Sequence, residues 1–151
     1  MGDLEDLYQA TILDHKKSPQ NFRVLDTPNR QAEGHNPLCG DKLNLYLDVD
    51  QDNRIRDISF QGEGCAISTA SASLMTQAIK GKTQTEVEEI FARFHKLVTT
   101  EIGQQVDIPD LGKLAVFSGV REYPMRVKCA TLAWHTLRAA LADRGETAVT
   151  E

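Results

Sequence analysis

The chain contains three cysteines and a neighbouring aspartate whose side chains could together bind a metal ion. Cys39 and Asp41 lie in the segment PLCGD, Cys65 ends the segment GEGC, and Cys129 lies in RVKCATLAWH. Three thiolates and one carboxylate complete a four-coordinate site of the kind that zinc prefers, and the softness of sulfur also suits iron-sulfur chemistry. These residue types predict a metal centre, provided that the fold brings the distant segments together.

Cys39 and Asp41 share the parity of an alternating apolar strand. Leu43, Leu45 and Leu47 follow at every second position, so a continued strand would point both side chains toward the apolar face of a sheet. A carboxylate among buried leucines is costly unless it meets a cation or hydrogen-bond donors, and a metal shared with the neighbouring thiolate would supply the cation. The alternative is a solvated turn around Asp41, with Cys39 as a small buried hydrophobic residue.

Cys65 and Cys129 each have a structural alternative to metal binding. The glycines before Cys65 suit a helix start, where free backbone N–H groups favour thiolate over thiol. They could also serve only the turn, with Cys65 in the core. Cys129 begins an apolar stripe through Leu132, Ala133 and Leu137, which is typical of a helix face packed in the core. The prediction of a metal site depends on the three cysteines taken together. All three are predicted at the ends of strands or helices, where they can converge.

Basic residues near the predicted centre would balance its charge. Three thiolates and a carboxylate carry four negative charges against two positive charges on zinc, which leaves a residual charge of about −2. Arg121, Arg126 and Lys128 are the sequence-local candidates for this role. Their alternative role is a solvated helix start.

The four histidines are weaker candidates for ligands. His35, close to Cys39 in sequence, is the one histidine retained as a possible neighbour of the ligands. His135 lies about 240° around an ideal helix from Cys129, so the two side chains face apart. His15 and His95 fall late in predicted helices, where a cation suits the helix dipole, and we expect ordinary surface or capping residues there. The sequence also lacks a G-x-S-x-G motif and a phosphate-binding loop.

Changes in hydrophobic period predict the elements that must position these residues. Residues 4–12 follow a helical period that ends before Pro19. Residues 20–38 are rich in Asn, Pro, Gln and Gly, which indicates an irregular or edge-strand connection. The period then changes to two in residues 43–49, and a turn-forming DQDN leads into residues 54–60. This pattern predicts a hairpin with one apolar face.

Helical patterns dominate the remainder of the chain. They occupy the segments 65–80, 85–98, 111–117 and roughly 126–143. Thr85 followed three residues later by Glu88 forms a capping-box pattern at the second of these segments. The order of elements predicts an α+β fold, in which helices pack on one face of a small antiparallel sheet of about three strands.

Length and composition predict one domain spanning residues 1–151, with 40% hydrophobic residues to form its core. The formal net charge of −5 lacks the positive field that attracts a protein to nucleic acid. The N-terminal MGDLEDLYQ does not resemble a secretory signal, and no segment approaches the ~20 apolar residues of a membrane span. We therefore expect a cytoplasmic protein with neither nucleic acid nor membrane as its partner.

Four segments of the chain resemble the U-type iron-sulfur cluster assembly proteins, the group that contains IscU, NifU and SufU. The segments are LYQATILDHKKSPQN, NPLCGD, GEGCAIS and KCATLAWHTLRAALAD. They follow the order of that family over nearly the whole chain. The resemblance implies a SufU/IscU-like domain and assigns the family's metal ligands to Cys39, Asp41, Cys65 and Cys129.

Two departures from the scaffold branch indicate the SufU branch. In the IscU scaffolds, the sequence that ends at the last cysteine is similar to LPPVKLHC. It contains a histidine that can join the cluster site and a proline pair that a chaperone recognises. This chain has EYPMRVKC, so Lys128 replaces the histidine and only Pro124 remains of the pair. The segment after Lys82 is also longer than in that branch, and its apolar spacing predicts mainly core packing.

The SufU resemblance implies a zinc-dependent sulfurtransferase of the SUF system, with Zn²⁺ as its cofactor. It would accept persulfide sulfur from a SufS-like cysteine desulfurase and pass it to a SufB-like assembly complex. Cys39 would be the persulfide acceptor, released when a desulfurase histidine takes its metal position. Asp41, Cys65 and Cys129 would hold zinc throughout, with Lys128 and Arg126 beside the ligands.

Two other functions stay open on the sequence. The same four ligands could assemble and transfer a [2Fe-2S] cluster, since their softness permits either metal. Zinc could also be purely structural in an interaction domain, because four filled positions are typical of a closed structural site. Aspartate is a less usual fourth ligand for such a site.

Overall fold

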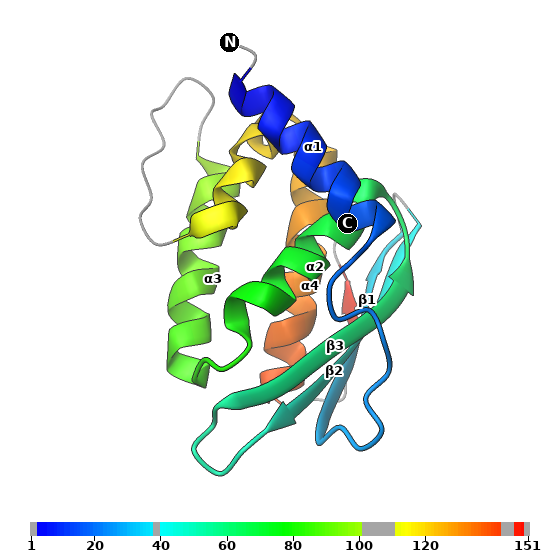
Figure 1. The fold of residues 1–151 in the computed structure, drawn as a ribbon, viewed down its shortest axis with the longest axis vertical. Helices are drawn as coiled ribbons and strands as arrows, with labels where there is room; N and C mark the ends of the chain where they lie inside the picture. Colours follow the sequence, from blue (N-terminus) through cyan, green and yellow to red (C-terminus); the bar gives the residue numbers. More distant parts are fainter. Residues whose placement is uncertain (1–2, 38–39, 101–110, 143–146, 150–151) are drawn as a thin grey trace.

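The computed structural model describes residues 3–37, 40–100, 111–142 and 147–149, which form a sheet with helices packed beside it, as Figure 1 shows. The elements in chain order are α1 (Asp3–Lys17), β1 (Arg30–Asn36), β2 (Asp41–Val49), β3 (Ile55–Glu63), α2 (Ala66–Ile79), α3 (Gln84–Thr99), the 3-10 helix η1 (Gly112–Glu122), α4 (Pro124–Ala142) and β4 (Thr147–Val149). Among these described residues, no helix combines the length and the apolar character needed to cross a membrane.

The sheet has the strand order β3-β2-β1-β4. β2 pairs antiparallel with both neighbours, and Leu45 lies opposite Ala32 on one side and Phe60 on the other. The predicted hairpin and the three antiparallel strands are confirmed. β4 is not predicted by the sequence; it pairs in parallel with β1 and makes β1 an interior strand rather than an edge. A strand of three residues is too short to show an alternating pattern.

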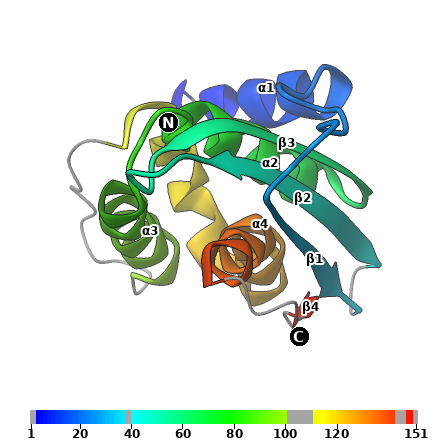
Figure 2. The ribbon, with the colours of Figure 1, turned by 90° about the horizontal axis from the view of Figure 1, so that it is seen from below.

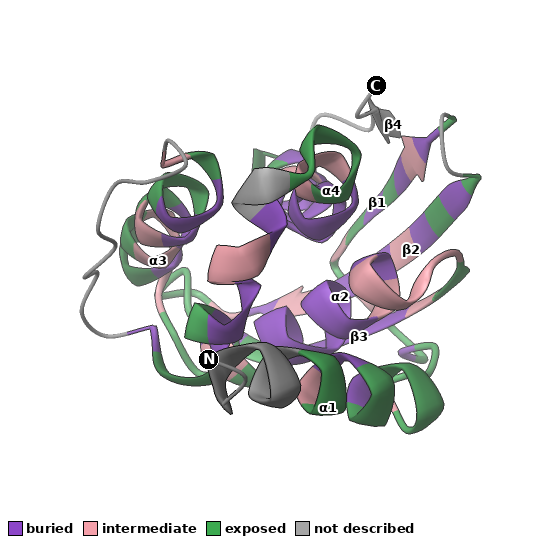
Figure 3. Ribbon diagram, turned by 90° about the horizontal axis from the view of Figure 1, so that it is seen from above, coloured by how far each residue is buried: buried purple, intermediate pink, exposed green. Residues whose placement is uncertain are grey.

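Helices α2 and α4 pack directly against one face of the sheet, and the other helices cover them (Figure 2). α4 contacts β1 and β2, α2 contacts β3, and α1 contacts α2. Buried residues accordingly concentrate on α2, α4 and the inner side of the strands (Figure 3). The α+β class with helices on one face is therefore confirmed. Serine and alanine make up much of the buried surface of α2, which allows the helices to approach closely.

Aromatic rings fill the space between α3, η1 and α4. Trp134 of α4 stacks on Phe94, with ring centroids 4.8 Å apart, and on Phe91 at 6.1 Å. Phe94 in turn meets Phe117 of η1 edge to face. Most of the described apolar side chains of the longer segment after Lys82 thus pack in the core, as predicted.

Two helix starts differ from the predicted ones. The capping box of α3 pairs Thr83 with Glu86, because the Thr83 hydroxyl accepts from the Glu86 N–H and the Glu86 carboxylate accepts from the Thr83 N–H. The expected pair, Thr85 and Glu88, has the same spacing but already lies inside the first turns of the helix. α4 begins at Pro124, two residues earlier than predicted, since proline is favoured at the first helical position.

The expectation that His15 is an ordinary surface or capping residue is wrong. Its side chain is buried between α1 and α2, and its Nδ1 lies 2.6 Å from the Ser73 hydroxyl. The backbone N–H of Gln20 donates to the same hydroxyl, and Asn21 donates to the Thr76 hydroxyl. α1 is therefore docked on α2 through polar contacts, and Ile12 of α1 is buried in the core.

We expect the metal-free protein to lose stability as the pH falls below about 6.5. Burial and the charge of Lys113 lower the pKa of His15 below the usual 6.5, although Asp14 opposes them. The unfolded chain then binds a proton that the folded chain does not, so this contribution to stability is present above pH 6.5 and is lost on acidification. Chemical denaturation between pH 5 and 8 should show a shallower pH dependence for His15→Gln. An unchanged dependence would contradict the assignment.

Candidate metal centre

Asp41 is the first residue of β2, and its side chain is fully buried. The residue lies opposite Asn36 in the β1–β2 ladder, on the face that packs against the helices. Its Oδ1 accepts a hydrogen bond of 2.8 Å from the backbone N–H of Cys65. The predicted inward orientation is therefore confirmed, and a helix N-terminus supplies part of the positive potential that a buried carboxylate needs.

Cys65 is the N-cap of α2, as the glycines before it predicted. Its Sγ accepts from the Ser68 N–H at 3.4 Å, which is the capping role usually taken by serine or aspartate. The thiol also lies 3.8 Å from Asp41 Oδ2, to which it donates. Cys65 and Asp41 thus meet through both backbone and side chain.

Cys129 is buried in α4, the helix that packs beside α2, and reaches the same point. It lies five residues after Pro124, so it is more than one turn inside the helix rather than at the predicted edge. The side-chain amide of Asn36 donates to its Sγ at 3.6 Å. Packing and proximity to the other candidate ligands therefore coexist at this position.

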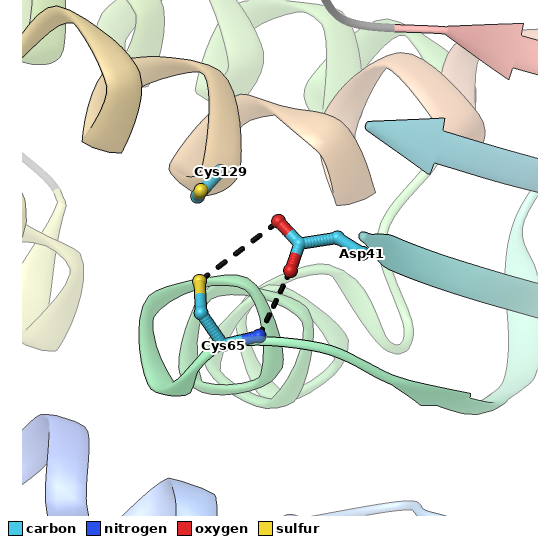
Figure 4. Close-up of side chains that lie close together, drawn as sticks. All are labelled: Asp41, Cys65 and Cys129. Atoms are coloured by element: carbon cyan, nitrogen blue, oxygen red, sulfur yellow. Dashed lines mark hydrogen bonds between the residues drawn. The ribbon is translucent and has the colours of Figure 1, made fainter. Parts of the chain in front are cut away.

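The ligand atoms of Asp41, Cys65 and Cys129 all lie within 4.8 Å of one another, and Figure 4 shows the three side chains converging from β2, α2 and α4. Two sulfurs and one carboxylate oxygen, half-buried or buried, form a donor set that suits zinc or an iron-sulfur cluster. Cys39, the fourth predicted ligand and the predicted persulfide acceptor, lies outside the described residues.

Cys65 is prepared to act as a thiolate. A hydrogen bond with Cys129 lowers the pKa of the Cys65 thiol to about 7, and the Ser68 N–H acts in the same direction. Burial and the negative charge of Asp41 oppose these effects. A substantial fraction of Cys65 is therefore deprotonated near neutral pH, and the thiolate is the form that binds metals.

The basic residues predicted near the centre differ in how exposed their side chains are. Arg126 is exposed and lies over the ring of Tyr123, with its guanidinium carbon 4.3 Å from the ring centroid. Lys128 is half-buried and directly precedes Cys129. The side chain of Arg121 lies outside the described residues. Lys16 of α1, which no sequence pattern links to the ligands, donates to the Gly64 carbonyl at 3.0 Å and so reaches the residue before Cys65.

Neither of the two histidines nearest the ligands in sequence points toward the centre. His35 lies between the buried residues Gly34 and Asn36 on β1, so its side chain projects to the other face of the sheet. The His35 side chain therefore points away from Asp41 and Cys129, while its expected place beside Cys39 involves a residue outside the described ranges. His135 contacts the ring of Phe91, which agrees with its prediction to face away from Cys129.

Gly64 allows the backbone before Cys65 to approach Asp41 closely. A Cβ at this position would collide with the Asp41 carboxylate and would lie 3.0 Å from its Cα. We expect Gly64→Ala to lower zinc affinity by roughly tenfold, because the methyl group displaces a candidate ligand. Competition titration with a chromogenic chelator measures this. Gly119→Ala, where a Cβ meets only open space, is the matched control. Equal affinities for both variants would contradict the prediction.

The family model of the NifU-like N terminal domain matches residues 7–130, a span that includes all four predicted ligands. The chain belongs to this family. Among its NifU-like relatives is the zinc-dependent sulfurtransferase SufU of Bacillus subtilis, 41% identical over 145 residues that cover 93% of each chain. The iron-sulfur cluster assembly scaffold protein IscU of Streptococcus pyogenes is 39% identical over 93% of this chain and 86% of that protein.

A solved structure of the same NifU-like type supports the fold. The protein from Fervidobacterium islandicum AW-1, assigned to the cluster assembly scaffolds of the SUF system, superposes with a TM-score of 0.80. It is 37% identical, and the match covers 91% of this chain and 98% of that one. Relatives of similar identity thus carry the names of a sulfurtransferase and of scaffolds.

Proposed function

We propose that the chain is an iron-sulfur cluster biogenesis protein of the SUF system that acts as a zinc-dependent sulfurtransferase. It would accept persulfide sulfur from a cysteine desulfurase and pass it to the downstream assembly complex. The observation that carries this proposal is the convergence of Asp41, Cys65 and Cys129 within 4.8 Å. Lys128, in the position where the IscU scaffolds keep a histidine, favours the SufU branch.

The residues of the centre fit a zinc ion, with Cys39 as the proposed fourth ligand. Asp41, Cys65 and Cys129 would hold the metal between strand and helices. When bound, zinc would keep the thiols deprotonated and, being redox-inert, would not oxidise them. The hydrogen bonds of Cys65 and Asp41 already orient their donor atoms toward each other, so the protein contributes a partly formed site.

The transfer step that we assign to Cys39 is a thiol–disulfide type exchange. The Cys39 thiolate attacks the terminal sulfur of the desulfurase persulfide and forms a new S–S bond. The original S–S bond breaks, and the desulfurase cysteine leaves as a thiolate. No external oxidant is required, because the sulfane sulfur moves at its own oxidation level.

A [2Fe-2S] scaffold is the second candidate. The IscU relative and the Fervidobacterium structure carry scaffold names at nearly the same identity as SufU. The same thiolates and carboxylate suit iron as well as zinc. On this function the protein would hold the cluster as cargo and would not raise the turnover of a desulfurase.

Anaerobic purification followed by metal analysis and a desulfurase assay separates the candidates. We expect about one zinc per chain and a large increase in the turnover of the cognate desulfurase, which Cys39→Ala abolishes. Gln51→Ala, an exposed change in the turn between β2 and β3, is the control and should retain full stimulation.

Other outcomes would exclude sulfur transfer. A chromophoric cluster that passes to an apo-ferredoxin, with no stimulation of the desulfurase, would establish the scaffold instead. Zinc without either activity would leave a structural metal site.

A further inference from the structure

Asn36 is the polar side chain that links β1 to the candidate metal centre. It is the last residue of β1 and is fully buried. The N–H groups of a buried amide need hydrogen-bond acceptors. Asn36 Nδ2 donates to Cys129 Sγ at 3.6 Å. A thioether or thiol is a weak acceptor, whereas a thiolate is a strong one. This contact therefore gains strength when Cys129 binds a metal as thiolate.

The position of Asn36 in the sheet couples it to a second ligand. Asn36 and Asp41 are partners in the β1–β2 ladder. One rung of the sheet thus presents the carboxylate that faces Cys65 and the amide that faces Cys129. Because both side chains are buried and project toward the helices, the rung fixes the relative positions of groups from β2, α2 and α4.

We propose that Asn36 is a positioning residue of the metal centre that holds Cys129 as a fixed ligand. Its N–H orients the Cys129 sulfur toward Asp41 and Cys65 and withdraws negative charge from it. A thiolate that accepts a hydrogen bond is less nucleophilic, so Asn36 also keeps Cys129 out of sulfur exchange. This inference rests on the proposed metal site and adds a residue that lies outside the ligand set.

The test compares Asn36→Leu with Asn44→Leu. Leucine keeps the branched outline of asparagine but removes the amide. Asn44 lies half-buried on β2, with its side chain on the opposite face of the sheet from Asp41. We expect Asn36→Leu to lower zinc affinity by roughly tenfold or more in a competition titration. Asn44→Leu should bind zinc as the parent does.

Cobalt substitution gives a spectroscopic readout that a general loss of packing does not produce. Without the N–H donor the Cys129 thiolate becomes more electron-rich, so the sulfur-to-cobalt charge-transfer band should move to longer wavelength in Asn36→Leu. The band should keep its position in Asn44→Leu. An Asn36→Leu protein with the affinity and the spectrum of the parent would overturn the inference while leaving the metal site intact.

If Asn36→Leu fails to fold, a measurement on the unmodified chain can still test whether Asn36 donates to the metal-bound Cys129 sulfur. In the protein loaded with ¹¹³Cd, the side-chain amide proton of Asn36 should show a scalar coupling to cadmium through the N–H···S bond. Resolved cadmium coupling of the cysteine protons without any coupling to Asn36 would overturn the inference. A parent chain that binds neither zinc nor cadmium would overturn the metal site and this inference together.

Discussion

Replacing Cys65 with serine should lower the affinity for zinc by roughly 100-fold or more, because a direct ligand contributes at least as much as the outer partners of a metal site. Serine is nearly isosteric, and its hydroxyl can accept from the Ser68 N–H as the cysteine sulfur does. The cap of α2 is therefore preserved while the thiolate is lost. Competition titration with a chromogenic chelator gives the affinity, and circular dichroism checks the fold.

Thr83→Ser is the matched control for Cys65→Ser. It changes the N-cap residue of α3 and keeps a hydroxyl that can accept from Glu86. We expect zinc binding identical to that of the parent. A Cys65→Ser protein that binds zinc as tightly as this control would remove Cys65 from the ligand set.

Trp134→Ala should destabilise the protein by about 3–5 kcal/mol, the range typical of removing a large aromatic side chain from a core. The indole is fully buried and stacks on both Phe91 and Phe94, so the surrounding rings cannot easily close the cavity. Trp134 is the only tryptophan of the chain, so unfolding in urea has to be followed by circular dichroism rather than fluorescence.

The control for this core substitution is Leu13→Ala, where the side chain of α1 is 63% exposed. Its free energy of unfolding should stay within about 0.5 kcal/mol of the parent value. Similar losses for both variants would contradict the placement of Trp134 at the centre of the core.

Features that depend on local chemistry were predictable from the sequence. The parity of Asp41 with the following leucines fixed its inward direction, since side chains alternate along a strand. The glycines before Cys65 indicated a helix start, and Cys65 is the N-cap of α2. Cys129 was expected at a helix edge, yet proline at the first position moved the start of α4 back by two residues.

Features that depend on contacts between distant segments were not predictable in the same way. Asn36 faces Cys129 across 93 positions of the chain, and His15 meets Ser73 across 58. No periodicity near Asn36 signalled a strand strongly, because β1 contains glycine and several polar residues. Once β1 is paired with β2, however, Asn36 is seen to lie directly opposite Asp41, which makes it a candidate neighbour of the metal centre. The missing information was the register of the sheet.

Mass spectrometry of the chain after incubation with its cognate desulfurase and cysteine shows directly whether sulfur is transferred to Cys39. Anaerobic proteolysis with alkylation of free thiols and persulfides would locate the transferred sulfur atom. We expect one added sulfur on the peptide that contains Cys39 and none on those that contain Cys65 or Cys129, which remain metal ligands. Sulfur on Cys65 or Cys129, or on no cysteine at all while the desulfurase turns over, would contradict this expectation.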